Sequence, residues 1–159
     1  MKKNVYLLVM LTCLFIAACT GGSRKETKSF HDSLDSNDTL AMISLADSCM
    51  TLLKGSRIDY ALDMLQAYND STHSISPLSE EQRAIYRNKF SMFPVLSYER
   101  VYYSFQKDGC NDVKYSVVFA EDPNNGPAKT SYMFNPVKID GLWYLTVKTS
   151  GQDINMNRR

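Results

Sequence analysis

One pair of side chains in the sequence is suited to acid–base chemistry. Glu99 and Tyr103 lie in a segment of alternating apolar residues, and a strand there would place both on one face. A carboxylate in an apolar pocket has a raised pKa and can transfer protons, here with Asn135 as a neighbour. Alternatively, the strand end frays or bulges, and Glu99 then meets solvent or a lysine. The pair is therefore a hypothesis with a structural alternative.

The remaining polar residues give weaker signals. Asp59 and Asp63 have a spacing that presents two carboxylates together on a helix, although a solvated helix face is the expected interpretation. His31 has acidic and hydroxyl neighbours in the chain, but adjacency in sequence does not make a catalytic triad. His73 fits a surface loop. Because the sequence has no Cys-x-x-Cys motif and no phosphate-binding loop, we predict no catalytic residue, no metal and no cofactor.

The beginning of the chain carries the sharpest signal. Two lysines precede the apolar segment 5–18, and Cys19 follows it directly. The segment is shorter than the roughly 20 residues that a membrane span needs, but it suits the core of a signal peptide. Its ending, Ala17-Ala18-Cys19, resembles the bacterial lipobox. The resemblance implies cleavage before Cys19, attachment of diacylglycerol to its sulfur, and acylation of the new N-terminus. The alternative is an ordinary signal peptide with a cysteine at this position by chance.

A lipobox would define how the protein is anchored and where. The net charge is +1, and loss of the two lysines leaves the mature chain slightly acidic, so that the acyl chains must hold it on the membrane. Thr20 follows the cysteine in place of the aspartate that often signals retention in the inner membrane. We therefore expect the outer membrane of a Gram-negative bacterium, with the domain in the periplasm or at the cell surface. Near-neutral charge also argues against a nucleic-acid partner.

Two cysteines remain after processing. Cys13 leaves with the signal peptide, whereas Cys49 and Cys110 stay in a compartment that permits disulfides. They form a bridge only if their Cα atoms approach within ~7 Å. A helix position and the tip of a hairpin need not do so, and two free thiols are the alternative.

The mature chain has a polar tether followed by three predicted helices. Residues 19–38 lack a sustained apolar period and predict the lipidated cysteine and a flexible tether. The first helix begins at Asp38 or Thr39 and ends at Gly55, and the second covers 58–68, with Ser56 as its cap. The third has a capping box formed by Ser79 and Gln82, and Pro94 ends it.

From residue 95 the apolar period changes to two. We predict strands at 95–106, 111–121, 129–138 and 142–149, joined by short turns into an antiparallel meander. Three-residue loops at 107–109 and 139–141 give the register with the best apolar grouping. The fold class is therefore α+β, with three N-terminal helices on a curved four-stranded sheet. The domain spans 39–149, and 150–159 is a polar tail.

This register assigns two faces to the sheet. The face that we expect to pack on the helices carries the following residues: Glu99, Val101, Tyr103, Phe105, Val113, Tyr115, Val117, Phe119, Met133, Val137, Trp143, Leu145 and Val147. The other face also carries Arg100, Lys114, Val118 and Thr146, and its aromatic residues form a candidate contact face: Tyr98, Tyr102, Tyr132, Phe134 and Tyr144. Such a face suits self-association or a flat ligand, because tyrosine offers large area with a polar tip. Alternatively, these are cross-strand pairs that only stabilise the sheet.

Helices followed by a meander that closes on Asp140-Gly141-Leu142-Trp143 resemble the nuclear transport factor 2-like (cystatin-like) superfamily, and in particular small secreted lipoproteins of unknown function. The resemblance implies a curved sheet wrapped around helices, with a pocket in the cone and dimers formed through the sheet. Glu99, Tyr103, Asn135 and Trp143 would line that cone.

The expected function is that of a lipid-anchored, non-catalytic binding or assembly protein of the cell envelope. Its partners would be the membrane, through the lipid, and a second copy or another envelope protein, through the tyrosine face. Two alternatives stay open: an inhibitor or immunity-type partner of an envelope protein, and a small enzyme that uses the cone.

Overall fold

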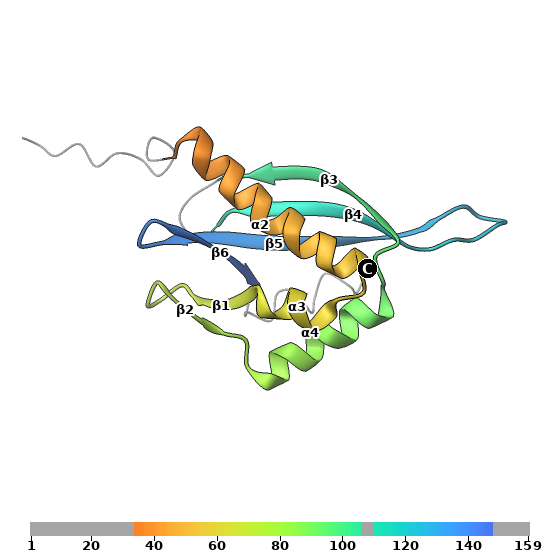
Figure 1. Cartoon of the computed structure of the whole chain (residues 1–159), viewed down its shortest axis with the longest axis horizontal. Coiled ribbons are helices and arrows are strands. Elements are labelled where there is room, and N and C mark those ends of the chain that lie inside the picture. The colour runs from red at the N-terminus through yellow and green to blue at the C-terminus, as the bar shows by residue number, and fades with distance from the viewer. Residues whose placement is uncertain (1–33, 106–109, 148–159) are drawn as a thin grey trace, which may run out of the picture.

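The computed structural model describes residues 34–105 and 110–147, which form three helices on one face of a six-stranded sheet (Figure 1). The predicted signal peptide, Cys19, most of the tether, the 107–109 loop and the tail lie outside the described residues. The elements run in this order: α2 Ser36–Lys54, α3 Ile58–Asp63, β1 Leu65–Asn69, β2 Ser74–Pro77, α4 Glu80–Met92, β3 Ser97–Ser104, β4 Asp112–Ala120, β5 Ala128–Ile139 and β6 Leu142–Val147.

The strand order in the sheet is β2-β1-β6-β5-β4-β3. The predicted meander of β3 to β6 is present, and so is the packing of helices on one face. The prediction of a four-stranded, purely antiparallel sheet is wrong, because β1 and β2 add two strands and β1 pairs with β6 in parallel. Within the described chain, β2 and β3 are therefore the two edge strands.

The strands β1 and β2 replace what was predicted as the end of a helix and a loop. Helix α3 ends at Asp63 because the chain from Leu65 onward pairs with β6. Leu65 and Tyr68 fit a helical period, which made the segment look like a helix, but pairing in the sheet satisfies backbone groups of β6 that would otherwise form an open edge. Ser56 does not cap α3. Its φ is 56°, and Arg57 is the N-cap, without a side-chain hydrogen bond.

Helix α2 begins earlier than its sequence pattern indicates. Asp35 is the N-cap and forms a capping box with Asp38, so that the helix starts at Ser36, inside the predicted tether. The predicted end at Gly55 is confirmed, and so is the capping box of Ser79 and Gln82 in α4. Leu40, which was predicted on the apolar stripe of α2, is exposed.

The turn between β5 and β6 has two residues, not the predicted three. Ile139 pairs with Leu142, and Asp140 and Gly141 have φ angles of 50° and 82°, as a type I′ turn requires. A shift of one residue exchanges the faces of a strand. Therefore the side chains of Tyr132 and Phe134 on β5 face the helices. The prediction had placed Met133 on that face instead.

A bulge at Val101 divides strand β3. Arg100 lies opposite Tyr115, and Tyr102 lies opposite Lys114, so that Val101 has no partner on β4. The predicted pairing of Tyr103 with Val113 is confirmed beyond the bulge. Before the bulge the faces are exchanged relative to the prediction, and Tyr98 and Arg100 face the helices.

The core lies between α2, α4 and the sheet. Tyr115 on β4 and Tyr132 on β5 lie opposite each other and are the largest buried side chains. The rings of Phe90 on α4 and Tyr132 pack edge to face, with centroids 5.2 Å apart. Phe134 packs against Tyr115 at 6.1 Å. Aromatic contacts therefore join α4 to the two central strands β4 and β5 within the core.

Candidate functional site

Three consecutive large side chains on the edge strand β3 are exposed. Val101, Tyr102 and Tyr103 are 55%, 41% and 47% exposed, and we call these three residues the β3 rim. They are consecutive residues at the bulge, where the alternation of side chains between the two faces of the sheet is reversed. Tyr102 and Tyr103 point to opposite sides of the sheet, so that the exposed apolar side chains flank the edge itself. Clustered exposed apolar residues often mark a contact site.

Polar contacts to α2 hold the strand that carries the rim. The Arg100 guanidinium donates to the Asp47 carboxylate at 2.8 Å, and the Tyr115 hydroxyl donates to the same group at 2.6 Å. The hydroxyls of Tyr98 and Thr51 are 3.2 Å apart. Burial and the neighbouring Asp47 carboxylate raise the pKa of Tyr115 well above its usual value. The phenol therefore stays protonated and serves as a donor.

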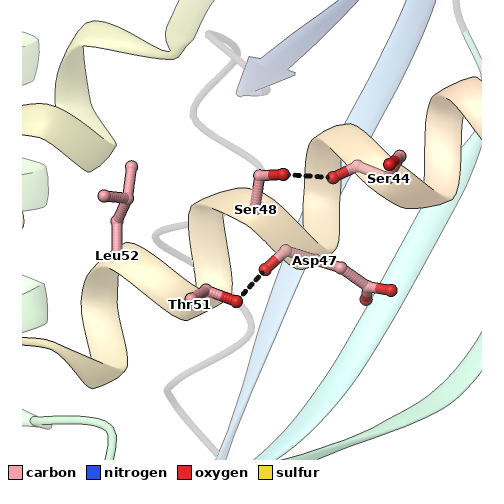
Figure 2. Close-up of a pocket in the computed structure, with 5 residues that line it drawn as sticks. All are labelled: Ser44, Asp47, Ser48, Thr51 and Leu52. Carbon is pink, nitrogen blue, oxygen red and sulfur yellow. Dashed lines mark hydrogen bonds between the residues drawn. The ribbon is translucent and has the colours of Figure 1, made fainter.

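An open groove of about 390 Å³ lies on the exposed side of α2 (Figure 2). Its lining residues are Ser44, Asp47, Ser48, Thr51 and Leu52. The hydroxyls of Ser48 and Thr51 donate to carbonyls one turn earlier, at 2.7 and 2.8 Å. Because Asp47 is already bound by Arg100 and Tyr115, the polar groups of the groove are largely satisfied within the protein.

The four residues predicted to line a cone do not come together. Glu99 is exposed and lies opposite Ser116, on the face away from the helices, whereas Tyr103 lies opposite Val113, on the helix side. The bulge between them places the two side chains on opposite faces, as the alternative interpretation allowed. The prediction that Glu99 and Tyr103 share one face of the sheet is therefore wrong.

Asn135 is buried on β5 in a hydrogen-bonded position. Its amide donates to the Asn111 carbonyl at 3.2 Å and to the Asp112 carboxylate, and the Thr146 hydroxyl donates to the Asn135 carbonyl. Asn111 donates in turn to the Pro136 carbonyl at 3.0 Å. These bonds join β4, β5 and β6, and they assign Asn135 a structural role.

Trp143 lies on the helix side and binds the beginning of α2. Its indole N–H donates to the Asp38 carboxylate at 2.9 Å, and the Lys138 ammonium pairs with the same oxygen. Asp38 is nearly buried. The Lys138 side chain is 27% exposed, and Trp143 is half-buried. The hydrogen bond from Lys138, with that from Trp143, lowers the pKa of Asp38 against the opposing effect of burial. We call Asp38, Lys138 and Trp143 the α2 clamp.

The predicted tyrosine face is divided between the two sides of the sheet. Tyr132 and Phe134 are each 2% exposed and lie under the helices, because the turn after β5 has two residues. Burial raises the pKa of Tyr132 to about 12, and its hydroxyl donates to the Phe93 carbonyl at 2.5 Å. Tyr98 also faces the helices. Of the predicted face, Tyr102 and Tyr144 point away from them, opposite Lys114 and Val137 respectively.

The paired carboxylates of α3 form a ladder with α4. Asp59 binds Arg87 at 2.6 Å, and Asp63 binds Arg83 at 2.8 Å. Both pairs repeat at a spacing of four residues, so that the spacing of the aspartates reflects helix-to-helix contact. The Arg87 hydrogen bond lowers the pKa of Asp59. His73 forms a hydrogen bond of 3.0 Å with the Tyr68 hydroxyl in the β1–β2 hairpin.

Cys49 and Cys110 are free thiols, which is the second of the two predicted alternatives. Cys49 is buried in α2, and burial raises its pKa to about 12. Among the residues that the structure describes, no group of three or more His, Cys, Asp or Glu side chains could hold a metal ion. The same part of the chain contains no helix that is long and apolar enough to cross a membrane.

Sequence reasoning missed the residues that join α2 to the sheet. Asp38 was considered only as a helix cap, and Asp47 was not considered at all. Their partners Lys138 and Arg100 are distant in sequence, so that no local pattern signals these contacts. The one local signal was the Asp35-x-x-Asp38 spacing, which is typical of a cap.

Comparison with known proteins gives little further information. No family model matches the sequence, and no curated protein matches it. The structure is similar to that of a Campylobacter jejuni protein described as an NTF2-like transpeptidase, with 14% sequence identity and a TM-score of 0.35, over 72% of this chain and 100% of that chain. A similarity of this size assigns neither a fold family nor an activity.

Proposed function

We propose that this chain is a lipid-anchored, non-catalytic protein of the bacterial cell envelope that binds another protein through the β3 rim. The single observation that carries the proposal is the exposure of three consecutive large side chains on an edge strand. An edge strand also presents backbone N–H and C=O groups to a partner. Aromatic residues with a polar tip are enriched where proteins meet.

The charged groups support binding rather than catalysis. Asp38 is paired with lysine, and Asp47, Asp59 and Asp63 are each paired with arginine, all within 4 Å. A general base needs a carboxylate free to reach its substrate. Glu99, the carboxylate considered for that role, is exposed on the side away from Tyr103.

The anchoring part of the proposal depends on the beginning of the sequence. Apolar residues 5–18 followed by Ala17-Ala18-Cys19 support lipidation of Cys19, and Thr20 favours the outer membrane. The described domain begins at α2, so that the intervening residues can separate it from the lipid surface. We also propose that the domain is nuclear transport factor 2-like, because its helices are followed by a meander of strands.

Photo-crosslinking in living cells tests the contact surface. A photoreactive amino acid replaces Tyr102 in the β3 rim, and a matched control replaces Ile85, which is 57% exposed on α4. We expect a specific crosslinked product from position 102 that is absent from position 85. Equal crosslinking at both positions, or none at position 102, contradicts the rim as the contact surface.

Membrane fractionation tests the anchor separately. Cys19 is the only residue that the lipobox pattern allows to carry lipid. Cys19→Ser is therefore expected to leave an unprocessed precursor or to move the protein to the soluble fraction. Normal maturation of this variant with unchanged membrane association contradicts lipidation while leaving the contact surface untested by that result.

A further inference from the structure

We propose that the C-terminal residues 148–159 of this chain bind over the outer face of its own sheet, where they cover a buried cluster on β5 and β6. The outer face is the face away from the helices, and the outer-face cluster consists of Asn135, Val137 and Thr146. The proposed occupant begins directly after β6. This inference is independent of the lipid anchor and of the β3 rim.

The register of β5 places the cluster on the outer face. Pro136 lies opposite Leu145, which belongs to the core under the helices. Because successive side chains of a strand alternate between faces, Asn135 and Val137 point away from the helices. Thr146 lies opposite Asn135 and shares its face. Val137 is accordingly not part of the hydrophobic core that the helices share with the sheet.

The cluster is buried, although no helix or strand in the described ranges lies over it. Asn135, Val137 and Thr146 are 5%, 0% and 1% exposed. Met133 points to the same face two residues earlier in β5 and is 36% exposed, so that the sheet alone does not bury side chains on this side. A sheet face without a covering layer is in contact with water. The burial of the cluster therefore requires an occupant.

The cluster presents an apolar surface to that occupant. The Thr146 hydroxyl donates to the Asn135 carbonyl, and the Asn135 amide donates to the Asn111 carbonyl at 3.2 Å. These polar groups are therefore bound within the sheet. Val137 and the half-buried Tyr144 opposite it remain for apolar contact. Removing such surface from water favours binding.

The sequence after β6 supplies apolar side chains with a suitable spacing. Residues 148–159 contain two large apolar residues, Ile154 and Met156, in an otherwise polar segment. Because they are two positions apart, they lie on the same side of an extended segment. Asn155 and Asn157 lie on the other side and face solvent. Ile154 and Met156 therefore contact the outer-face cluster.

The path from β6 to the cluster is short and requires one reversal of the chain. Val137 lies opposite Tyr144, so that it is roughly 10 Å from Val147 at ~3.3 Å per residue. Ser150-Gly151 is a dipeptide typical of turns. Strands β1 and β5 occupy the two edges of β6, and the helices occupy the other face of the sheet. The returning segment therefore lies over the outer face.

The two other segments that adjoin the described residues begin on the helix side of the sheet. The chain before α2 leads to Asp38, which accepts a hydrogen bond from Trp143 on that side at 2.9 Å. The loop 106–109 begins at Phe105, whose ring centroid is 5.9 Å from that of Trp143. Residues 148–159 begin instead at β6, which carries part of the cluster.

Alkylation of a cysteine at position 137 tests the proposal. Val137→Cys is made with Cys110→Ser in the full chain and in a chain that ends at Thr149, and peptide mass spectrometry measures the reaction at each position. We expect position 137 to react at least tenfold faster in the shortened chain, because a thiol reacts where it is accessible. Leu142→Cys is the control. Leu142 is 61% exposed, and its position should react equally in both chains.

A matched pair of double variants keeps the chain at full length. Ile154→Ser with Met156→Ser removes the two apolar side chains, whereas Asn155→Ser with Asn157→Ser changes the side that faces solvent. The first should accelerate alkylation of position 137 at least tenfold, and the second should leave it unchanged. Thermal unfolding verifies that both variants are folded. Equal rates in the two double variants, or in the full and shortened chains, overturn the proposal.

Disulfide formation identifies the chain that supplies the occupant. Val137→Cys is combined with Ile154→Cys or with Met156→Cys in the Cys110→Ser background. We expect at least one of these pairs to form a disulfide within a single chain, and Asn155→Cys in the same place to form none. A disulfide-linked dimer means that a second copy supplies the segment and overturns the proposal. The absence of a disulfide in both pairs overturns it as well.

Discussion

The α2 clamp gives the sharpest prediction about stability. Asp38→Asn preserves the shape of the side chain and removes its charge, so that Lys138 loses its ion pair. Asp38 is 10% exposed at its side chain, and Lys138 is 27% exposed. A surface pair contributes about 0–1 kcal/mol, and breaking a buried pair costs about 3–5 kcal/mol. Since this pair lies between the two cases, we expect a loss of about 2 kcal/mol in the free energy of unfolding at pH 7.

The pH dependence of this loss has a definite sign. The hydrogen bond from Lys138 lowers the pKa of Asp38 in the folded state relative to its ordinary value of 3.8. The stabilisation is therefore complete above the unfolded pKa and is lost as the pH falls through the folded pKa. The difference between wild type and Asp38→Asn should be constant near neutral pH and should shrink below about pH 4.

Urea unfolding of the chain from residue 20 onward, followed by tryptophan fluorescence between pH 7 and pH 3, measures this difference. Asp140→Asn is the matched control, because Asp140 is exposed in a type I′ turn that accepts asparagine. We expect the control to unfold like the wild type at pH 7. A change below about 0.5 kcal/mol in Asp38→Asn, or a difference that grows as the pH falls, would refute the reasoning.

Two further predictions concern the interior. Tyr115→Phe removes a hydrogen bond to the Asp47 carboxylate, and Tyr132→Phe removes one to the Phe93 carbonyl. Bonds to charged groups contribute about 1.5–3 kcal/mol and neutral ones about 1 kcal/mol, so that denaturant unfolding should show the larger loss for Tyr115→Phe; the reverse order would contradict this. Cys49 should resist alkylation in the native protein at pH 8 and react after unfolding, because burial raises its pKa to about 12. Mass spectrometry of the native protein that shows rapid labelling of Cys49 would disprove it.

Local signals predicted much of the secondary structure. The capping box of Ser79 and Gln82 and the end of α2 at Gly55 are confirmed, since caps depend on residues three or four positions apart. The meander strands are also present near their predicted positions. In contrast, β1 was interpreted as helix, because its preference for a strand comes from pairing with β6, a segment distant in the sequence.

The candidate site was less predictable than the elements that carry it. Tyr102 was correctly predicted on the face away from the helices, whereas Tyr132 and Phe134 are buried. Two local features caused the errors: the two-residue turn after Ile139 reverses the faces of Tyr132 and Phe134, and the bulge at Val101 reverses the face of Tyr98. Each exchanges the faces of a strand, and the sequence is compatible with either choice.

The sequence by itself determined the α+β class of the domain, the order of the four meander strands, and the lipobox-like resemblance at its beginning, because these depend on composition and local spacing. Only the tertiary structure decided which side chains meet. Asp38 binds Lys138, and Asp47 binds Arg100, across separations in sequence that no local pattern spans. The exposure of the β3 rim is likewise a property of the assembled sheet. It depends on the position of β3 at the edge of the sheet and on the bulge at Val101, which shifts the register of the strand by one residue.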